Sequence, residues 1–244
     1  MQARPKVVAQ RYAEGHRDSQ RKAFVYLCVT SVYFCGIAAA AQPIEAALKR
    51  QGLVNIQTID PSILVELKYS TTDNFVGKDV YDDLTTAYMQ PVAARKLAEA
   101  SRLLQAQNPN LRLLVYDAAR PRTAQWKLWN ALTKYPENER QKYVADPRKG
   151  SIHNYGCAVD LTLADKTGKA LDMGTPYDYF GILAYPSEEN ALLKQGKLTQ
   201  NQVKNRQLLR SMMRGAGFSP IEFEWWHFNA LPREKAKMMF RIVE

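Results

Sequence analysis

The hydrophobic and polar positions of this 244-residue chain predict a strand followed by a helix in its first half. Residues 63–69 partly alternate between apolar and polar side chains and are rich in strand-forming types, which predicts a strand. Residues 86–107 place Ala, Leu and Val at helical spacing, and Pro91 is tolerable in the first turn of a helix. We therefore expect a helix there. Residues 43–51, upstream of both elements, indicate a short linker or helix.

A second strand and a second helix follow. Residues 111–116 form a short apolar run of strand length, and residues 123–134 return to a helical pattern. Arg120 and Pro121 fall between the two. The step from Arg120 to Pro121 is therefore predicted to lie at a strand-to-helix junction.

The middle of the chain predicts a polar loop, residues 151–156, that leads into a third strand, residues 158–163. Side chains of a strand point alternately to its two faces. Ala158, Asp160 and Thr162 should therefore share one face of this strand.

The remaining pattern completes the fold prediction. Residues 165–168 are typical of a hairpin turn, residues 201–214 predict a helix that ends at Gly215 or Gly217, and residues 221–228 predict a last strand. Strands and helices do not alternate regularly along the chain. We therefore expect an α+β fold, a single domain with a mainly antiparallel sheet flanked by helices, rather than a doubly wound one.

The amino-terminal segment has the pattern of an export signal. Residues 23–44 contain no charged side chain, follow two basic residues and include a run of four alanines. This predicts cleavage near Ala40 or Ala41, although an uncharged stretch of this length is also able to span a bilayer uncut. We assign residues 1–41 to a signal peptide or membrane anchor and residues 42–244 to an exported, periplasmic domain.

The formal net charge of +10 first suggests a nucleic-acid partner. Lys and Arg are, however, scattered among acidic residues, with no long basic run and no basic face at helical spacing. We therefore expect no nucleic-acid partner. A moderately positive surface mainly implies attraction to anionic partners, and an anionic cell envelope is one of them.

The chain has three histidines, two of which lie in chemically unusual segments. The first segment contains His153 and, seven residues later, Asp160. Seven extended residues cover about 23 Å, whereas ligands of one zinc ion lie at about 2 Å from it. The two side chains can therefore share a metal only if the chain doubles back, and Gly156 supplies a place to turn.

The second segment contains Glu224 and His227. Residues three apart in an ideal strand point to opposite faces, so both can flank one metal only if the backbone is irregular near Trp225. Two imidazoles and a carboxylate would leave one zinc position open to water, as in catalytic sites, and a neighbouring carboxylate that is not a ligand can then accept a proton. The alternative is a packed histidine beside tryptophans, with Asp160 as a buried hydrogen-bond acceptor.

Two motifs carry a resemblance to a known family. The first motif, Ser-x-His-x6-Asp, and the second, Glu-x-Trp-His, together resemble the double signature of zinc peptidases that act on D-Ala-D-Ala ends of cell-wall peptides. Four further blocks are similar to the D-alanyl-D-alanine dipeptidase branch. The blocks begin at Tyr69, Asp117, Met173 and Glu224.

The resemblance implies a role for each matched residue. His153, Asp160 and His227 would hold one Zn²⁺ per chain, and Glu224 would be the general base. The remaining matches are Arg120, which would stabilise charge on the attacked carbonyl, Asp178, which would receive the free ammonium of a dipeptide, and Ser151, which would contact substrate.

The sequence departs from the family pattern at two places, both of which bear on how the amino end of the substrate is recognised. Ala119 stands where an aromatic residue is common in the family, and residues 80–83, near which the family places a substrate-contacting tyrosine, do not align cleanly. The implied activity is hydrolysis of the D-Ala-D-Ala dipeptide to free D-alanine, linked to cell-wall peptide turnover or glycopeptide resistance. The alternatives are a D-Ala-D-Ala carboxypeptidase acting on peptidoglycan stem peptides and an inactive, zinc-stabilised binding module.

Overall fold

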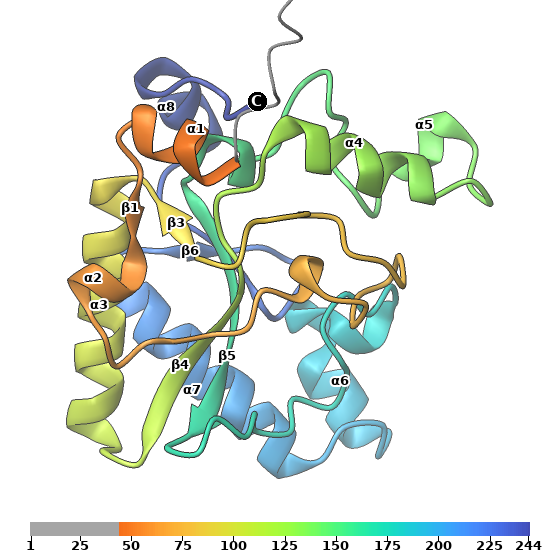
Figure 1. The fold of residues 1–244 in the computed structure, drawn as a ribbon. Helices are drawn as coiled ribbons and strands as arrows, with labels where there is room; N and C mark the ends of the chain where they lie inside the picture. The colour runs from red at the N-terminus through yellow and green to blue at the C-terminus, as the bar shows by residue number, and fades with distance from the viewer. Residues whose placement is uncertain (1–43) are drawn as a thin grey trace, which may run out of the picture. The chain divides into compact units, whose positions relative to one another are not determined.

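We describe residues 44–244 from a computed structural model, shown as a ribbon in Figure 1. The predicted signal peptide or anchor, residues 1–41, lies outside the described residues. Within residues 44–244, no helix is both long enough and apolar enough to cross a membrane.

A five-stranded sheet forms the centre of the fold, in the order β2-β4-β5-β7-β6. Strand β2 pairs in parallel with β4, and every other neighbouring pair in this sheet is antiparallel. The prediction of an α+β domain with a mainly antiparallel sheet is confirmed. The strands of this sheet are β2 (Leu64–Val65), β4 (Leu111–Asp117), β5 (Ala158–Asp165), β6 (Ser219–Pro220) and β7 (His227–Asn229).

Helices α3 and α7 pack against each other, α3 also contacts β4, and α7 also contacts β5. Helix α4 lies at the upper right of Figure 1, and α3 lies at the left. The main core is one continuous cluster of aliphatic and aromatic side chains, in which Leu97, Leu113 and Trp226 are almost completely buried. The helices are α1 (Ile44–Arg50), α2 (Ile56–Ile59), α3 (Pro91–Gln107), α4 (Arg122–Ala131), α5 (Glu137–Arg140), α6 (Glu189–Lys194), α7 (Gln200–Gly215) and α8 (Arg233–Met239).

The shorter elements lie around this centre. Strands β1 and β3 form a separate two-stranded antiparallel sheet. The remaining elements are β1 (Val54–Asn55), β3 (Tyr88–Met89) and the 3₁₀ turns η1 (Lys68–Ser70), η2 (His153–Tyr155), η3 (Ile182–Ala184) and η4 (Pro186–Glu188).

Four predicted elements agree with the structure to within a few residues: β4, α4, β5 and α7. The helix predicted over residues 86–107 begins only at Pro91, because residues 88–89 pair with β1. A proline is favoured at the first position of a helix, where the missing N–H would have no partner inside the helix.

Two strand predictions are mostly wrong. Of residues 63–69 only β2 is a strand, and the chain then turns through η1, where the amide side chain of Asn74 donates to the carbonyl of Lys68 at 3.0 Å. Of residues 221–228 only His227 and Phe228 belong to β7, while residues 221–226 are irregular. The expected irregularity near Trp225 is thus confirmed and is longer than a single bulge.

Candidate metal centre and active site

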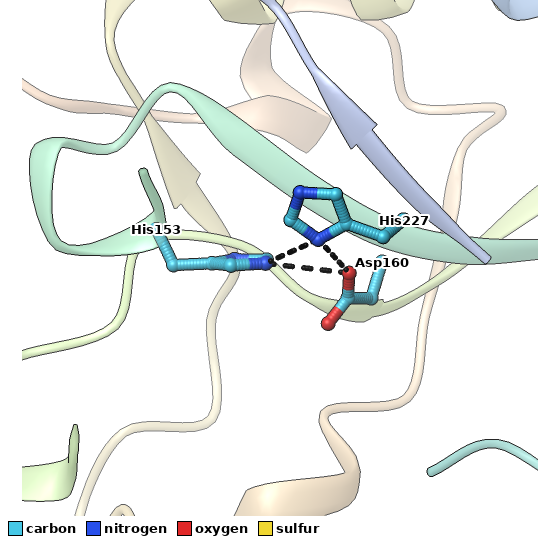
Figure 2. A group of neighbouring side chains, drawn as sticks. All are labelled: His153, Asp160 and His227. Atoms are coloured by element: carbon cyan, nitrogen blue, oxygen red, sulfur yellow. Dashed lines mark hydrogen bonds and ion pairs between the residues drawn. The ribbon is translucent and has the colours of Figure 1, made fainter. Parts of the chain in front are cut away.

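Three potential ligand atoms meet near the start of β5, where β7 also begins (Figure 2). Asp160 of β5 lies directly opposite His227 of β7 in the antiparallel register, and its Oδ1 is 2.9 Å from His227 Nδ1. His153 reaches the same point from η2, with its Nε2 3.1 Å from His227 Nδ1 and 3.3 Å from Asp160 Oδ1. The sequence therefore predicted correctly which three side chains come together.

The turn at Gly156 makes this convergence possible. After the single 3₁₀ turn of η2, Gly156 adopts a left-handed conformation with φ of 66° and reverses the chain into β5. A Cβ atom at this position would lie 2.8 Å from Leu53 Cδ2 and 3.3 Å from the backbone nitrogen of Gln90. Glycine is therefore favoured here by its left-handed conformation, and an added Cβ would also force the Leu53 side chain to move.

The outer nitrogens of both imidazoles have acceptors that fix the ring orientation. His153 Nδ1 is 2.7 Å from the carbonyl oxygen of Ala118, and His227 Nε2 is 2.9 Å from Asn229 Oδ1. Each outer nitrogen thus donates a proton, so in the neutral rings His153 Nε2 and His227 Nδ1 present lone pairs to each other. Two facing lone pairs and a carboxylate oxygen repel unless a cation lies between them, and this donor set suits a divalent metal.

The pKa shifts of His227 and Asp160 also indicate that positive charge is favoured at this position. Burial acts to lower the pKa of His227, but the hydrogen bond to Asp160 and the charge of that carboxylate outweigh burial and raise the pKa to about 9. Burial acts to raise the pKa of Asp160, yet the two imidazoles hold it well below its ordinary value. A carboxylate that stays charged while buried needs positive charge beside it, which a proton or a metal ion supplies.

Glu224 lies beside the three residues without joining them. Its Oε2 is 3.9 Å from His227 Nδ1, and 30% of its side chain is exposed to the cavity in front of the cluster. Burial raises the pKa of Glu224 above its ordinary value. A carboxyl group with a raised pKa next to a metal position is suited to accept and return a proton.

Arg120 is buried three residues beyond the end of β4, and all three nitrogens of its guanidinium donate hydrogen bonds. Its Nε and Nη2 donate to Asp117 Oδ2 at 2.9 and 2.5 Å, and its Nη1 donates to Gln125 Oε1 at 3.0 Å. Nη2 also lies 3.7 Å from Asp160 Oδ2, and the guanidinium is 5.0 Å from the centre of the Tyr69 ring. A fixed guanidinium therefore faces the cavity next to the metal cluster.

Asp178 lines the cavity in a strained backbone conformation, with φ of 58°. Its Oδ1 accepts a hydrogen bond from the Tyr69 hydroxyl at 3.1 Å, whereas its Oδ2 is buried without a partner within the part of the chain described. Burial and the charge of Asp160 raise the pKa of Asp178 well above its ordinary value. No helix begins at Asp178, so its side chain is not a helix cap.

Ser151 lies in the wall of the same cavity, and its hydroxyl oxygen is buried without a hydrogen-bond partner in residues 44–244. The cavity has a volume of about 250 Å³. Sites for drug-sized ligands usually occupy about 300–1,000 Å³. The space therefore suits a small ligand. All seven residues singled out from the sequence border this one cavity: Arg120, Ser151, His153, Asp160, Asp178, Glu224 and His227.

Several further residues shape the site, although no role for them follows from the sequence. Asp117 is fully buried and accepts hydrogen bonds from Arg120 and from the hydroxyl of Tyr81. Tyr177 donates to Asp160 Oδ2 at 3.0 Å. Asp117 and Tyr177 both stand in quoted motif blocks, but only the fold shows which group each of them contacts. Tyr81, in the poorly aligned segment, does not line the cavity.

Comparison with known proteins agrees with this geometry. Residues 49–242 match the model of the Peptidase_M15 family, described as D-ala-D-ala dipeptidase. The chain is 37% identical over 177 residues to the D-alanyl-D-alanine dipeptidase of Escherichia coli (strain K12), an alignment that covers 72% of this chain and 83% of that protein. It is 31% identical over 194 residues to a D-alanyl-D-alanine dipeptidase of Enterococcus faecium, covering 72% and 90%.

A solved structure of the LdcB LD-carboxypeptidase overlaps 62% of this chain and 63% of its own, with 15% identity and a TM-score of 0.38, and this weak likeness adds nothing to the assignment. The match to the family model and the two relatives are sufficient without it. The chain belongs to the Peptidase_M15 family of D-Ala-D-Ala dipeptidases.

Proposed function

We propose that this protein is a zinc-dependent dipeptidase that hydrolyses D-alanyl-D-alanine to free D-alanine. The observation that carries the proposal is the meeting of His153, Asp160 and His227 in a cavity of about 250 Å³ that also holds Glu224 and Asp178. The D-alanyl-D-alanine dipeptidases to which the chain is similar are named for this reaction. A role in cell-wall peptide turnover or glycopeptide resistance is part of the proposal.

Zinc is the proposed metal, with His153 Nε2, His227 Nδ1 and Asp160 Oδ1 as its ligands. Zn²⁺ commonly takes imidazole nitrogen and carboxylate oxygen in a four-coordinate arrangement, and three protein ligands leave one position open. When bound, the metal would polarise the scissile carbonyl and lower the pKa of water. Metal analysis of the purified protein tests its identity, and a different stoichiometric metal contradicts zinc.

Glu224 and Arg120 perform the protein's part of the hydrolysis. Glu224 takes the proton of the attacking water and returns it to the leaving amine, because its carboxylate borders the metal position without entering the ligand set. Arg120 donates to the oxygen of the attacked carbonyl as negative charge develops there, and Asp117 holds the guanidinium in place for this contact.

Asp178 selects the dipeptide. Asp178 lines the cavity, and its carboxyl group, whose Oδ2 is buried without a partner in the described residues, is suited to pair with the free ammonium group of a substrate. A stem-peptide carboxypeptidase would leave this carboxyl without a cation, because the amino group of the penultimate residue is acylated in such a substrate. The orphaned oxygen therefore favours a dipeptidase, and the presence of Glu224 and Arg120 at the metal position disfavours an inactive binding module.

Product analysis is the test. The zinc-loaded protein is incubated with D-Ala-D-Ala and, separately, with N-acetyl-D-Ala-D-Ala, and released D-alanine is quantified by mass spectrometry. We expect release from the free dipeptide and little from the acetylated one. Comparable release from both substrates would identify a carboxypeptidase, and release from neither would contradict the proposed function.

Export to the periplasm is also proposed, from the sequence pattern of residues 23–44 alone. Amino-terminal sequencing of the protein from fractionated cells tests it. We expect the mature chain to begin near Ala41 or Gln42. A product that keeps Met1 in the membrane fraction indicates the anchor, and one that keeps Met1 in the cytoplasmic fraction contradicts export.

A further inference from the structure

Two guanidinium groups line the cavity, and they differ in their partners. Arg120 is bonded to Asp117 and lies near Asp160, so its charge is compensated. Arg233 forms no ion pair with any carboxylate in residues 44–244, although it borders the same cavity. The cavity therefore contains one positive charge that the surrounding protein leaves without an acidic partner.

Backbone contacts hold Arg233 at the cavity wall. Its Nη2 donates to the carbonyl oxygens of Lys149 and Gly150, at 3.0 and 2.5 Å. These bonds use one of the two terminal nitrogens and leave the other terminal nitrogen and Nε without a hydrogen-bond partner in the described chain. Arg233 is the first residue of α8, and the preceding Pro232 restricts the approach of the chain to this helix.

The helix itself is anchored behind the site. Leu231 and Ala236 pack with Tyr155 and Cys157 in a small buried cluster. Tyr155 and Cys157 flank Gly156, the turn that places His153. The position of Arg233 is therefore tied to the same segment that builds the metal centre, and its direction is set by packing as well as by hydrogen bonds.

Ser151 lies next to this arginine. Gly150, whose carbonyl accepts from Arg233, directly precedes Ser151, and the Ser151 hydroxyl is buried without a partner in the described residues. The free nitrogens of the Arg233 guanidinium match the planar, doubly accepting shape of a carboxylate. The unpartnered acid in the same cavity, Asp178, makes no ion pair with Arg233.

We propose that Arg233 binds the C-terminal carboxylate of the substrate. This inference rests on the proposed dipeptidase function and adds to it the second charged end of the ligand. Asp178 receives the ammonium and Arg233 the carboxylate, so the cavity selects a zwitterionic dipeptide. A dipeptide whose carboxylate is amidated loses the charge that Arg233 recognises.

The experiment measures binding separately from turnover. The zinc-loaded Glu224→Gln protein, which should not hydrolyse its ligand, is titrated by calorimetry with D-Ala-D-Ala and with D-Ala-D-Ala amide. The same titrations are made with the double variant that carries Arg233→Gln as well. Glutamine keeps an amide donor for the carbonyls of Lys149 and Gly150 but removes the charge. Arg241→Gln is the matched control, because Arg241 is an exposed arginine of the same carboxyl-terminal segment that does not line this cavity.

We expect Arg233→Gln to weaken binding of the free acid about 10- to 100-fold, since hydrogen bonds to charged groups contribute at this level. Binding of the amide should change little, and Arg241→Gln should change neither ligand. Equal affinity of the Arg233→Gln protein and its parent for the free acid overturns the inference. Should Arg233→Gln fold poorly by circular dichroism, equal binding of acid and amide to the parent protein overturns it instead.

The design also separates this inference from the proposed function. If the unaltered protein fails to release D-alanine from D-Ala-D-Ala, the dipeptidase proposal fails. Selective loss of acid binding in Arg233→Gln then still supports a carboxylate site. If the unaltered protein is an active dipeptidase and Arg233→Gln binds both ligands as its parent does, only the assignment of Arg233 fails.

Discussion

Arg120 and Asp117 are joined by two hydrogen bonds, from Nε and Nη2 of the arginine to the same carboxylate oxygen. Asp117 is fully buried, and it lies where the register between β4 and β5 shifts, so a β-bulge at the end of the strand turns it toward the site. The guanidinium is therefore held in place by Asp117, the last residue of β4. Arg120 does not depend on a substrate to orient it.

We expect lysine to be a poor replacement for Arg120. A guanidinium offers donors in a fixed plane, whereas an ammonium is a mobile point charge and cannot keep both Asp117 and the reacting oxygen as partners. Arg120→Lys should lower kcat more than it raises KM, because the contact with the oxyanion strengthens in the transition state. Steady-state kinetics on D-Ala-D-Ala measure the split, and a near-normal kcat would assign Arg120 a structural role only.

A second prediction separates metal ligands from the general base. His153→Ala, Asp160→Ala and His227→Ala should each lose the zinc, because each removes one of three protein ligands. Glu224→Gln should keep one zinc per chain. Its kcat should fall about 10²- to 10⁴-fold, the usual contribution of proton transfer to the rate. Metal analysis beside activity distinguishes the two classes, and zinc loss in Glu224→Gln equal to that in the ligand variants would refute the assignment.

The local spacing showed how His153 and Asp160 can meet but left a packed histidine open, and the resemblance to the family selected these two residues and His227 as one group. His153 and Asp160 are separated by a short segment in which Gly156 permits the turn, and in β5 the polar Asp160 and Thr162 alternate with Val, Leu and Leu. The shape of residues 221–226 could not be predicted, since it depends on distant partners. Trp225 Nε1 donates to Thr175 Oγ1 at 2.8 Å, and the carbonyl of Trp226 accepts from the backbone of Leu161.

The same distinction explains the residues that sequence reasoning missed. Arg233 lies outside every motif, and only the fold shows that it bonds the backbone beside Ser151. The strand predicted over residues 63–69 failed because long-range contacts reshape the chain there. One of them is the hydrogen bond from the Ser70 hydroxyl to the carbonyl of Leu84.

A third prediction concerns Gly156 and uses Gly77 as its control. Both glycines have left-handed φ, 66° and 68°, but a Cβ on Gly77 would meet no atom within 4 Å. Gly77→Ala should therefore cost only the conformational penalty, roughly 1–2 kcal/mol of unfolding free energy. Gly156→Ala should cost more and should weaken zinc binding, because Leu53 or the turn must move. Urea unfolding of both variants measures this, and equal losses would remove the steric argument.

The raised pKa of His227 predicts a pH dependence for the metal-free protein. A group whose pKa is higher in the folded state, here about 9 against 6.5, contributes stability fully at low pH. That contribution is lost as pH rises from about 6.5 through about 9, and it amounts to about 3 kcal/mol at most. Chelated protein should therefore lose stability over this range. Chelated His227→Gln should not lose stability over this pH range. If its free energy of unfolding depends on pH as that of the unaltered protein does, His227 is not the source of the effect.

The last prediction concerns substrate length and follows from the unpartnered oxygen of Asp178. Burial raises the pKa of this carboxyl, so its charged form is costly until a cation arrives, and the ammonium of D-Ala-D-Ala supplies one. An acetylated substrate lacks that charge, and truncating one partner of a desolvated pair commonly costs about 2–5 kcal/mol, or roughly 30-fold to several-thousand-fold in kcat/KM. Asp178→Asn should weaken cleavage of the free dipeptide far more than that of N-acetyl-D-Ala-D-Ala, which narrows the ratio between the two. An unchanged ratio would mean that another group receives the amino end.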